Sequence, residues 1–153
     1  MTASTRTSLI IKAAPQALYD AWMDPEVLVQ WLPPADMTGQ FHAFDGRVGG
    51  GYDMSLFYPD SEPDHRGKTA GGEDRVQVRF LDLAPPRRIL QAVTFDTEDP
   101  ALKGEMRIEI TFLPVAAGTQ VTILAANLPP GLRPQDNDEG SRLSLEQLAA
   151  RFE

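Results

Sequence analysis

The sequence predicts an α+β fold in which a curved antiparallel β-sheet packs against a long C-terminal helix. From residue 37 onward, apolar residues recur at every second position in a series of short runs, as in strands with one buried face. In the last stretch, EGSRLSLEQLAARFE (residues 139–153), they recur at helical spacing. Two short helical segments separate the first strand from the rest. This element order is typical of a sheet that wraps around one helix.

The N-terminal part predicts one strand followed by two short helices. RTSLIIK (residues 6–12) is a β-branched run typical of a strand. A proline stands in the first turn of each following helix, residues 15–24 and 25–32. Asp24 is placed to cap the second helix, and Pro33 stops it.

Six further strands are predicted where the apolar period changes from about 3.6 to 2. Val76, Val78 and Phe80 show the clearest alternation, since each lies between polar residues. The predicted strands are residues 37–44, 51–58, 75–80, 87–95, 106–112 and 119–127. Residues 59–72 read as a polar loop, and 129–138 as a polar stretch before the last helix.

The apolar face of this sheet needs a cover, and the last helix is the long amphipathic element that can provide it. Leu145, Leu148, Ala149 and Phe152 form its apolar stripe. We therefore expect this stripe to lie on the inner face of the sheet.

Composition and charge exclude several classes of function. The 153 residues make about one domain, which we place at 1–153. The net charge of −8 argues against nucleic acid and anionic membrane partners. The absence of cysteine excludes disulfides, thiol catalysis and Cys-ligated zinc. MTASTRTSL lacks a signal peptide's apolar segment and no run reaches the roughly 18 residues of a membrane span, so we expect a cytoplasmic protein.

Four segments, in register, resemble one known family. IIKAAPQALYDAWMDPEVLVQWLPP (residues 10–34) is similar to the opening of the family named for activators of the heat-shock-protein-90 ATPase. DGRVGG (45–50) resembles its Asp-x-Arg-x-Gly-Gly turn, and FLDLAPPRRIL (80–90) resembles its strand–Pro–strand corner. GSRLSLEQL (140–148) resembles its terminal Gly-Trp-x-x-Ser-Leu-x-x-Leu helix. The resemblance covers nearly the whole chain.

This resemblance implies a fold and a cavity, but not one activity. The family belongs to the START-like (SRPBCC) superfamily, whose helix-grip fold is also that of the birch-pollen allergen. A seven-stranded sheet would grip the last helix, two short helices would close one end, and a cavity for apolar ligands would lie between sheet and helix. Members include lipid carriers, polyketide-processing proteins, self-sacrificing resistance proteins and chaperone activators.

The chain departs from the family pattern at three places. Trp31-Leu32-Pro33-Pro34 replaces a second Trp or a Gly near Trp31, Ser141 stands where the family has Trp, and the 59–72 loop is long and charged. A Trp at 141 would fill space between helix and sheet, whereas Ser leaves room and a hydroxyl. We expect a pocket that is wider near Ser141 than in relatives, and weaker ligand binding in Ser141→Trp.

The leading functional hypothesis is that a small hydrophobic or amphipathic ligand binds in this cavity. Apolar lining would bury the ligand, and the polar tips of Trp31, Tyr52 and Tyr58 would orient it. The alternative is that these apolar stripes are simply close-packed core. The residues expected to line the site are Trp31, Phe41, Tyr52, Met54, Leu56, Tyr58, Val78, Phe80, Ile108, Ile110, Ser141, Leu145 and Leu148.

Two other functions stay open at this point. The protein could regulate a chaperone ATPase by direct interaction in the stress response, as the family name implies. It could instead be a small-molecule enzyme, such as a cyclase, dehydratase or hydrolase, that uses pocket side chains. Catalytic residues are not identified, no cofactor is expected, and the oligomeric state, monomer or homodimer, stays open.

The polar residues give weak signals for catalysis or metal binding. His42 is either a general base or polar anchor, or a histidine that faces solvent or makes a structural hydrogen bond. Asp53 and Glu73 would act as acid or base only if burial shifted their pKa, and strand parity places Asp53 outside the cavity.

The acidic run before His65 is either a site for a hard cation or a solvated loop. Asp60, Glu62 and Asp64 alternate there, but the full ligand set of a calcium loop is absent. We therefore predict no metal site.

Overall fold

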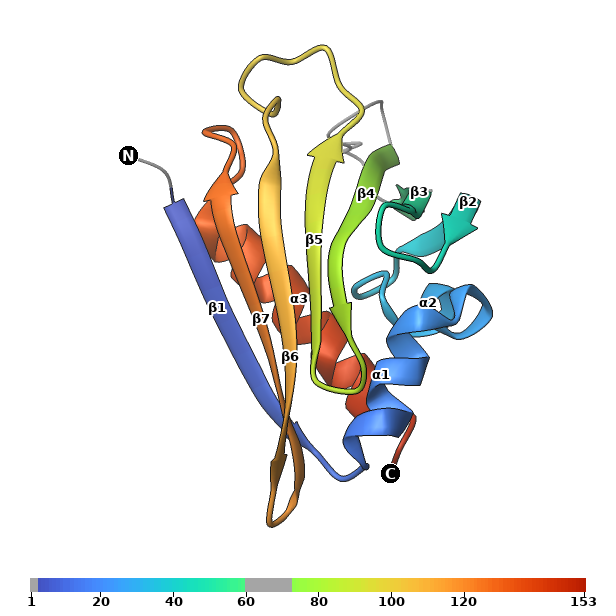
Figure 1. Ribbon diagram of the computed structural model, residues 1–153. Helices are drawn as coiled ribbons and strands as arrows, with labels where there is room; N and C mark the ends of the chain where they lie inside the picture. The colour runs from blue at the N-terminus through green and yellow to red at the C-terminus, as the bar shows by residue number, and fades with distance from the viewer. Residues whose placement is uncertain (1–2, 60–72) are drawn as a thin grey trace.

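The computed structural model describes residues 3–59 and 73–153, and it confirms the predicted α+β arrangement (Figure 1). The elements are β1 (Ala3–Ile11), α1 (Pro15–Met23), α2 (Pro25–Trp31), β2 (Thr38–Asp45), β3 (Gly51–Phe57), β4 (Glu73–Ala84), β5 (Arg88–Phe95), β6 (Met106–Val115), β7 (Gly118–Leu128) and α3 (Pro134–Ala150). The seven strands form one antiparallel sheet in the order β1-β7-β6-β5-β4-β3-β2. In Figure 1, α3 runs obliquely behind this sheet, as expected for a helix-grip fold.

The last helix begins earlier than predicted. Its first residue is Pro134, within the stretch that the sequence indicated as a polar connection, and its last is Ala150. Residues 134–138 (PQDND) contain no large apolar side chain, so apolar spacing could not reveal this first turn. Pro134 at the helix start and Asp136 in the first turn favour helix there, because proline needs no N–H partner and a carboxylate complements the helix dipole.

Several strands also extend beyond their predicted bounds. β1 begins at Ala3 and pairs with β7 along its length, and β4 runs from Glu73 to Ala84. A register shift between Phe80 and Asp82 breaks the alternation in β4, which is why apolar spacing stops short of its end. The hydrogen bonds between strands continue beyond the point where the alternation of apolar side chains ends.

The two short helices close one end of the core, and the cap of α2 is the one predicted from the sequence. The Asp24 side chain accepts a hydrogen bond from the Glu26 N–H (3.0 Å), as predicted for the start of α2. Trp22 of α1 and Trp31 of α2 meet edge to face with ring centroids 4.6 Å apart. Trp22 also meets Phe112 of β6 at 5.9 Å, which attaches both helices to the sheet.

Polar contacts fix α3 at both ends. Near its start, the Thr7 hydroxyl donates to Asp138 (2.6 Å), and the Asn137 amide donates to Thr5 (2.7 Å). Further along, the Ser144 hydroxyl donates to the Leu32 carbonyl (2.6 Å). The helix is therefore tied to β1 at one end and to the end of α2 at the other.

The backbone of α3 approaches β1 most closely, with shorter stretches near β7 and α2. It thus crosses the inner face of the sheet nearer to the β1 edge than to the central strands. None of the helices in residues 3–59 and 73–153 has the length and hydrophobicity needed to span a membrane.

Candidate functional site

Most of the residues expected to line a cavity lie on the inner face of the sheet, which α3 covers. Tyr52, Met54, Val78, Phe80 and Ile110 are all buried there. Leu145 and Leu148 of α3 are also fully buried. The predicted stripe and the predicted sheet face thus meet, and these side chains form the hydrophobic core.

Two of the predicted polar tips are already engaged within the protein. The Trp31 indole N–H donates to the Ala21 carbonyl (3.1 Å), so its polar end holds α1 against α2. The Tyr58 hydroxyl donates to Asp74 (3.1 Å), a carboxylate that is only 3% exposed. These two side chains contribute structure rather than free polar groups.

Ser141 lies on the sheet-facing side of α3. It stands one turn after Asn137 and Asp138, which bond to β1, and one turn before Ser144 and Leu145, which are buried. Its side chain is half-buried. The small side chain predicted to leave room is therefore placed between helix and sheet.

Part of the inner face stays incompletely buried. Leu56, Val76, Phe95 and Ile108 have inward strand parity, yet each is only partly buried and packs against the edge of the core. They belong to β3, β4, β5 and β6, the strands farther from α3. We call these four residues the apolar floor. Leu56, Val76 and Phe95 lie on neighbouring strands, whereas Ile108 lies beyond the buried pair of Val93 and Met106.

Gln91 and Tyr52 form a polar pair on the inner face, among apolar neighbours. Gln91 of β5 is 5% exposed and lies between Ile89 and Val93 on the inward side of the strand. It interacts through its side chain with the Tyr52 hydroxyl, and burial raises the pKa of Tyr52 while this hydrogen bond partly offsets the rise. The Gln91 Oε1 atom is buried and has no hydrogen-bond partner.

Sequence reasoning missed Gln91, although a signal was present. In RRILQAVTF, a glutamine occupies the inward position between two apolar residues of the same parity. A lone polar residue at such a position must find a buried partner or remain unpaired.

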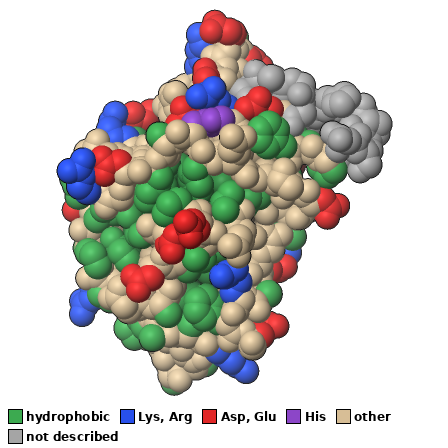
Figure 2. Space-filling view, turned by 90° about the vertical axis from the view of Figure 1, so that its right-hand side faces the viewer, with side chains coloured by type: hydrophobic (Ala, Val, Ile, Leu, Met, Phe, Trp, Pro, Cys, Tyr) green, Lys and Arg blue, Asp and Glu red, His purple; other side chains and the backbone are tan. Residues whose placement is uncertain are grey.

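Aromatic rings connect the pair of Gln91 and Tyr52 to β2, the edge strand. Phe44 of β2 stacks on Tyr52 with centroids 5.6 Å apart, and Phe41 meets Tyr52 edge to face at 5.2 Å. Both phenylalanines are half-buried. Figure 2 shows the side of the molecule that carries β2 and α2, where apolar side chains gather across the middle of the surface.

A hollow of about 260 Å³ lies elsewhere, between the end of β1 and the end of α3. Its lining consists of Ile10, Ile11, Lys12, Ala149, Phe152 and Glu153. None of these residues was expected to bind ligand. The hollow is partly open to solvent and brings together one lysine and one carboxylate.

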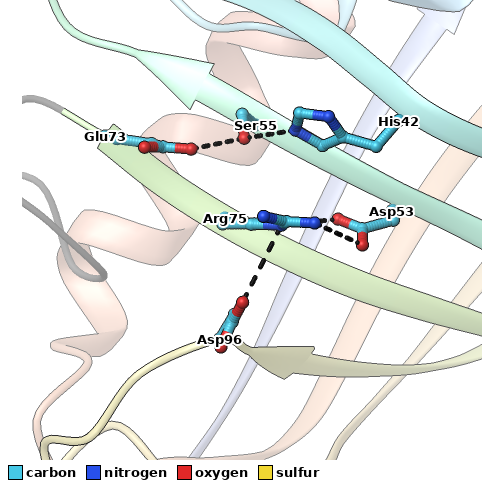
Figure 3. Close-up of polar contacts among 6 residues, drawn as sticks. All are labelled: His42, Asp53, Ser55, Glu73, Arg75 and Asp96. Atoms are coloured by element: carbon cyan, nitrogen blue, oxygen red, sulfur yellow. Dashed lines mark hydrogen bonds and ion pairs between the residues drawn. The ribbon is translucent and has the colours of Figure 1, made fainter.

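On the outer face of the sheet, three side chains form a hydrogen-bonded chain (Figure 3). The Ser55 hydroxyl donates to Glu73 Oε2 (2.5 Å) and lies 2.8 Å from His42 Nε2. His42 is the extra residue of a bulge in β2, where the register with β3 shifts between Phe41 and Ala43. The bulge turns the imidazole toward Ser55.

This arrangement is unsuited to nucleophilic catalysis. A serine nucleophile passes its proton to histidine, whereas Ser55 donates its proton to Glu73, so His42 Nε2 must act as the donor to Ser55. Ser55 is also completely buried, although His42 is exposed. The chain of bonds instead satisfies a buried hydroxyl and holds the bulge.

A second cluster on the same face is ionic (Figure 3). Arg75 binds Asp53 through two parallel hydrogen bonds of 3.0 and 2.9 Å, and its Nε lies 3.8 Å from Asp96. The hydrogen bonds from Arg75 hold the pKa of Asp53 below its ordinary value. Asp53 therefore lies outside the sheet–helix interior, as its parity predicted.

No group of three or more His, Asp or Glu side chains suited to hold a metal occurs within the described part of the chain. His65 and the acidic run of Asp60, Glu62 and Asp64 lie outside the described residues. The prediction about that run stays a prediction.

Comparison with known proteins gives one family. The family model described as "Activator of Hsp90 ATPase homolog 1-like protein" matches residues 12–153. The crystal structure of a protein from Chromobacterium violaceum is 30% identical, with 98% of this chain and 97% of that chain covered and a TM-score of 0.84. A search of curated protein sequences gave no match.

More distant structures share the fold alone. A solution structure from Arthrobacter aurescens is 20% identical, with 97% of this chain and 85% of that chain covered and a TM-score of 0.79. A crystal structure from Mycobacterium smegmatis is 17% identical, with 99% and 91% covered and a TM-score of 0.78. Because the family model spans nearly the whole sequence, the chain belongs to the family of activator of Hsp90 ATPase homolog 1-like proteins.

Proposed function

We propose that this protein binds a small amphipathic molecule on the inner face of the sheet, beside α3. The observation that carries the proposal is the apolar floor of Leu56, Val76, Phe95 and Ile108, which neither α3 nor the rest of the core buries completely. A floor left half-open suits a ligand that completes the burial.

The expected driving force is the removal of apolar surface from water. A ligand that covers about 100 Å² of floor would gain roughly 2.5 kcal/mol from the protein side alone, at about 25 cal/mol per Å². The ligand's own apolar surface adds a similar contribution. The two contributions sum to about 5 kcal/mol, which corresponds to a dissociation constant of about 0.2 mM for a compact aromatic or short-chain amphiphile.

The helix supplies the test. Ser141 lies between α3 and the sheet, so Ser141→Trp should fill the space that a ligand needs and weaken binding of fluorescent neutral amphiphiles about tenfold or more. Arg142→Trp introduces the same side chain at the exposed neighbouring position, where only an exposed pair with Glu146 is lost, and should leave affinity unchanged.

Fluorescence titration and the rise in melting temperature on ligand addition measure this effect. Native mass spectrometry of the purified protein would reveal a carried ligand. The proposal fails if a broad panel of neutral amphiphiles neither binds nor raises the melting temperature. It also fails if Ser141→Trp binds the panel as tightly as wild type.

The family description points to a second candidate, a regulatory interaction with a chaperone ATPase. Stimulated ATP hydrolysis by a purified chaperone, with no response to amphiphiles, would favour that function instead. An enzymatic role would require turnover that depends on an inner-face side chain such as Tyr52. For either role we propose a cytoplasmic location, in keeping with the acidic, cysteine-free sequence.

A further inference from the structure

We infer that Gln91 Oε1 is the polar anchor of the bound molecule and that the ligand carries a neutral hydrogen-bond donor, a hydroxyl or an amide N–H. This inference rests on the proposed function and names the chemical class of its ligand. It starts from a buried oxygen that has no partner. Nothing in the family match assigns a role to this residue.

The orphan oxygen lies on the inner face of a central strand. Gln91 pairs with Phe80 on β4 and with Ile108 on β6, so these two side chains flank it on the same face. Phe80 is 1% exposed and closes one side, whereas Ile108 belongs to the half-buried floor. Gln91 is therefore next to one residue of the floor, Ile108.

The neighbour across from Ile108 is small. Ile108 pairs with Ala125 of β7, and Ala125 pairs with Thr5 of β1, to which the Asn137 amide of α3 is bonded. Gln91, Ile108, Ala125 and Thr5 are thus side by side on four neighbouring strands. The last of them, Thr5, contacts α3 at Asn137, one turn before Ser141.

Tyr52 cannot satisfy Gln91 alone. A glutamine amide has two donor hydrogens and one acceptor oxygen. The Gln91 amide N–H donates to the Tyr52 oxygen, because this hydrogen bond lowers the pKa of Tyr52, and Oε1 is the end left unpaired. Since buried polar atoms are rarely left unpaired, Oε1 is available to a ligand that donates a hydrogen bond.

A neutral donor fits this position better than a charged one. The neighbours that the register and the strand give Gln91 are Phe80, Ile108, Ile89 and Val93, all apolar. A cation would lose its hydration without gaining a carboxylate, and an anion would face the carbonyl dipole of Gln91. A hydroxyl or amide N–H avoids both costs.

Two ligands that differ only in a hydrogen-bond donor test the role of Gln91. Naphthol and its methyl ether share one ring system, and the ether replaces only the O–H. In wild type at neutral pH, naphthol should bind about fivefold to tenfold more tightly than the ether, as expected for one buried hydrogen bond. In Gln91→Met, which keeps an unbranched side chain, naphthol should weaken about tenfold while the ether changes less than about twofold.

Gln120→Met is the matched control, because Gln120 lies on the outer face of β7 between Ile10 and Leu113. It should leave the ratio of the two affinities as in wild type. If Gln91→Met does not fold, the side-chain carbonyl resonance of Gln91 in wild type gives the second readout. That resonance should shift with naphthol and not with the ether.

The outcomes separate the inference from the function on which it rests. If both probes bind but the ratio of affinities is the same in wild type and Gln91→Met, the proposed ligand site is supported and the proposed role of Gln91 is wrong. The same result is expected if only water binds the Gln91 oxygen. If no amphiphile binds at all, the proposed function itself fails. A ratio that depends on Gln91 supports both.

Discussion

The two faces of the sheet differ in how their polar side chains are paired. On the outer face, charged side chains pair with one another: Arg75 with Asp53 and Asp96, Arg79 with Glu105, and Arg88 with Asp82 and Glu109. On the inner face, Gln91 keeps an unpaired oxygen in an apolar layer. Solvent can complete any pairing on the outer face, so an unmet polar group there costs little. On the inner face, an unpaired polar group lowers stability, and its presence therefore suggests a role in binding.

The largest expected difference between the faces comes from neighbouring residues of β4. Phe80→Ala removes a ring that is 1% exposed and contacts Tyr52 and Phe44, and it should lower the free energy of unfolding by about 3–5 kcal/mol. Arg79→Ala removes an exposed side chain paired with Glu105 at 3.6 Å and should cost at most about 1 kcal/mol. Urea unfolding of both variants checks this, and similar losses would contradict the assignment of the two faces.

Strand parity is also the reason that so much of the fold is predictable. The alternation of Val76, Val78 and Phe80 with polar residues is enough to indicate which side of the strand faces inward. It also predicts that Asp53 lies outward, where it is found with Arg75. Parity does not show which side chains remain half-buried, because that depends on where α3 crosses the sheet.

The rest of the site depends on long-range contacts that no local pattern encodes. The early start of α3 is fixed by hydrogen bonds from Thr7 and Asn137, which join positions more than 100 residues apart. The contact of His42 with Ser55 needs the bulge in β2, which shifts the register by one residue. Leu56, Ile108 and Ser141 were predicted from the sequence, whereas Gln91 was missed although its inward polar position was a signal.

Among the described residues of the outer face, Ser55 is a buried exception, and it provides the next prediction. Ser55→Ala removes a fully buried hydroxyl between His42 and Glu73 and should cost about 1–3 kcal/mol. Ser8→Ala removes an exposed hydroxyl that bonds Thr122 and should cost roughly 0.5 kcal/mol or less. Thermal and urea unfolding compare the two. Equal effects would show that the Ser55 contacts contribute no more than a hydrogen bond exposed to solvent.

The ion pair between Asp53 and Arg75 predicts a smaller, pH-dependent effect. Because the pKa of Asp53 is lower in the folded protein, its contribution is fully present above the ordinary aspartate range and is lost as the pH falls through the lowered pKa. Asp53→Asn should therefore destabilise the protein at neutral pH by about 1 kcal/mol or less, since Arg75 is 38% exposed.

The pH profile separates this effect from a general loss of packing. The difference between wild type and Asp53→Asn in urea unfolding should shrink as the pH is lowered toward roughly 3. Asp45→Asn is the comparison: hydrogen bonds from Arg47 also lower the pKa of Asp45, but this pair is much more exposed, so its pH-dependent difference should be smaller. A difference that is constant with pH would mean that the Asp53 charge is not responsible.

The smallest expected change in stability is that of Gln91→Met, and it best distinguishes the two faces. Replacing a well-paired buried glutamine normally destabilises a protein, because its partners are left unmet. In Gln91→Met, removal of the unmet oxygen offsets the loss of the hydrogen bond to the buried Tyr52 hydroxyl, so the free energy of unfolding should stay within about 1 kcal/mol of wild type. A residue that costs nothing to remove in the absence of ligand, but whose removal abolishes the preference for naphthol, would be retained for binding. A loss of several kcal/mol in Gln91→Met would instead make Gln91 a paired part of the core, and its oxygen would not be available to a ligand.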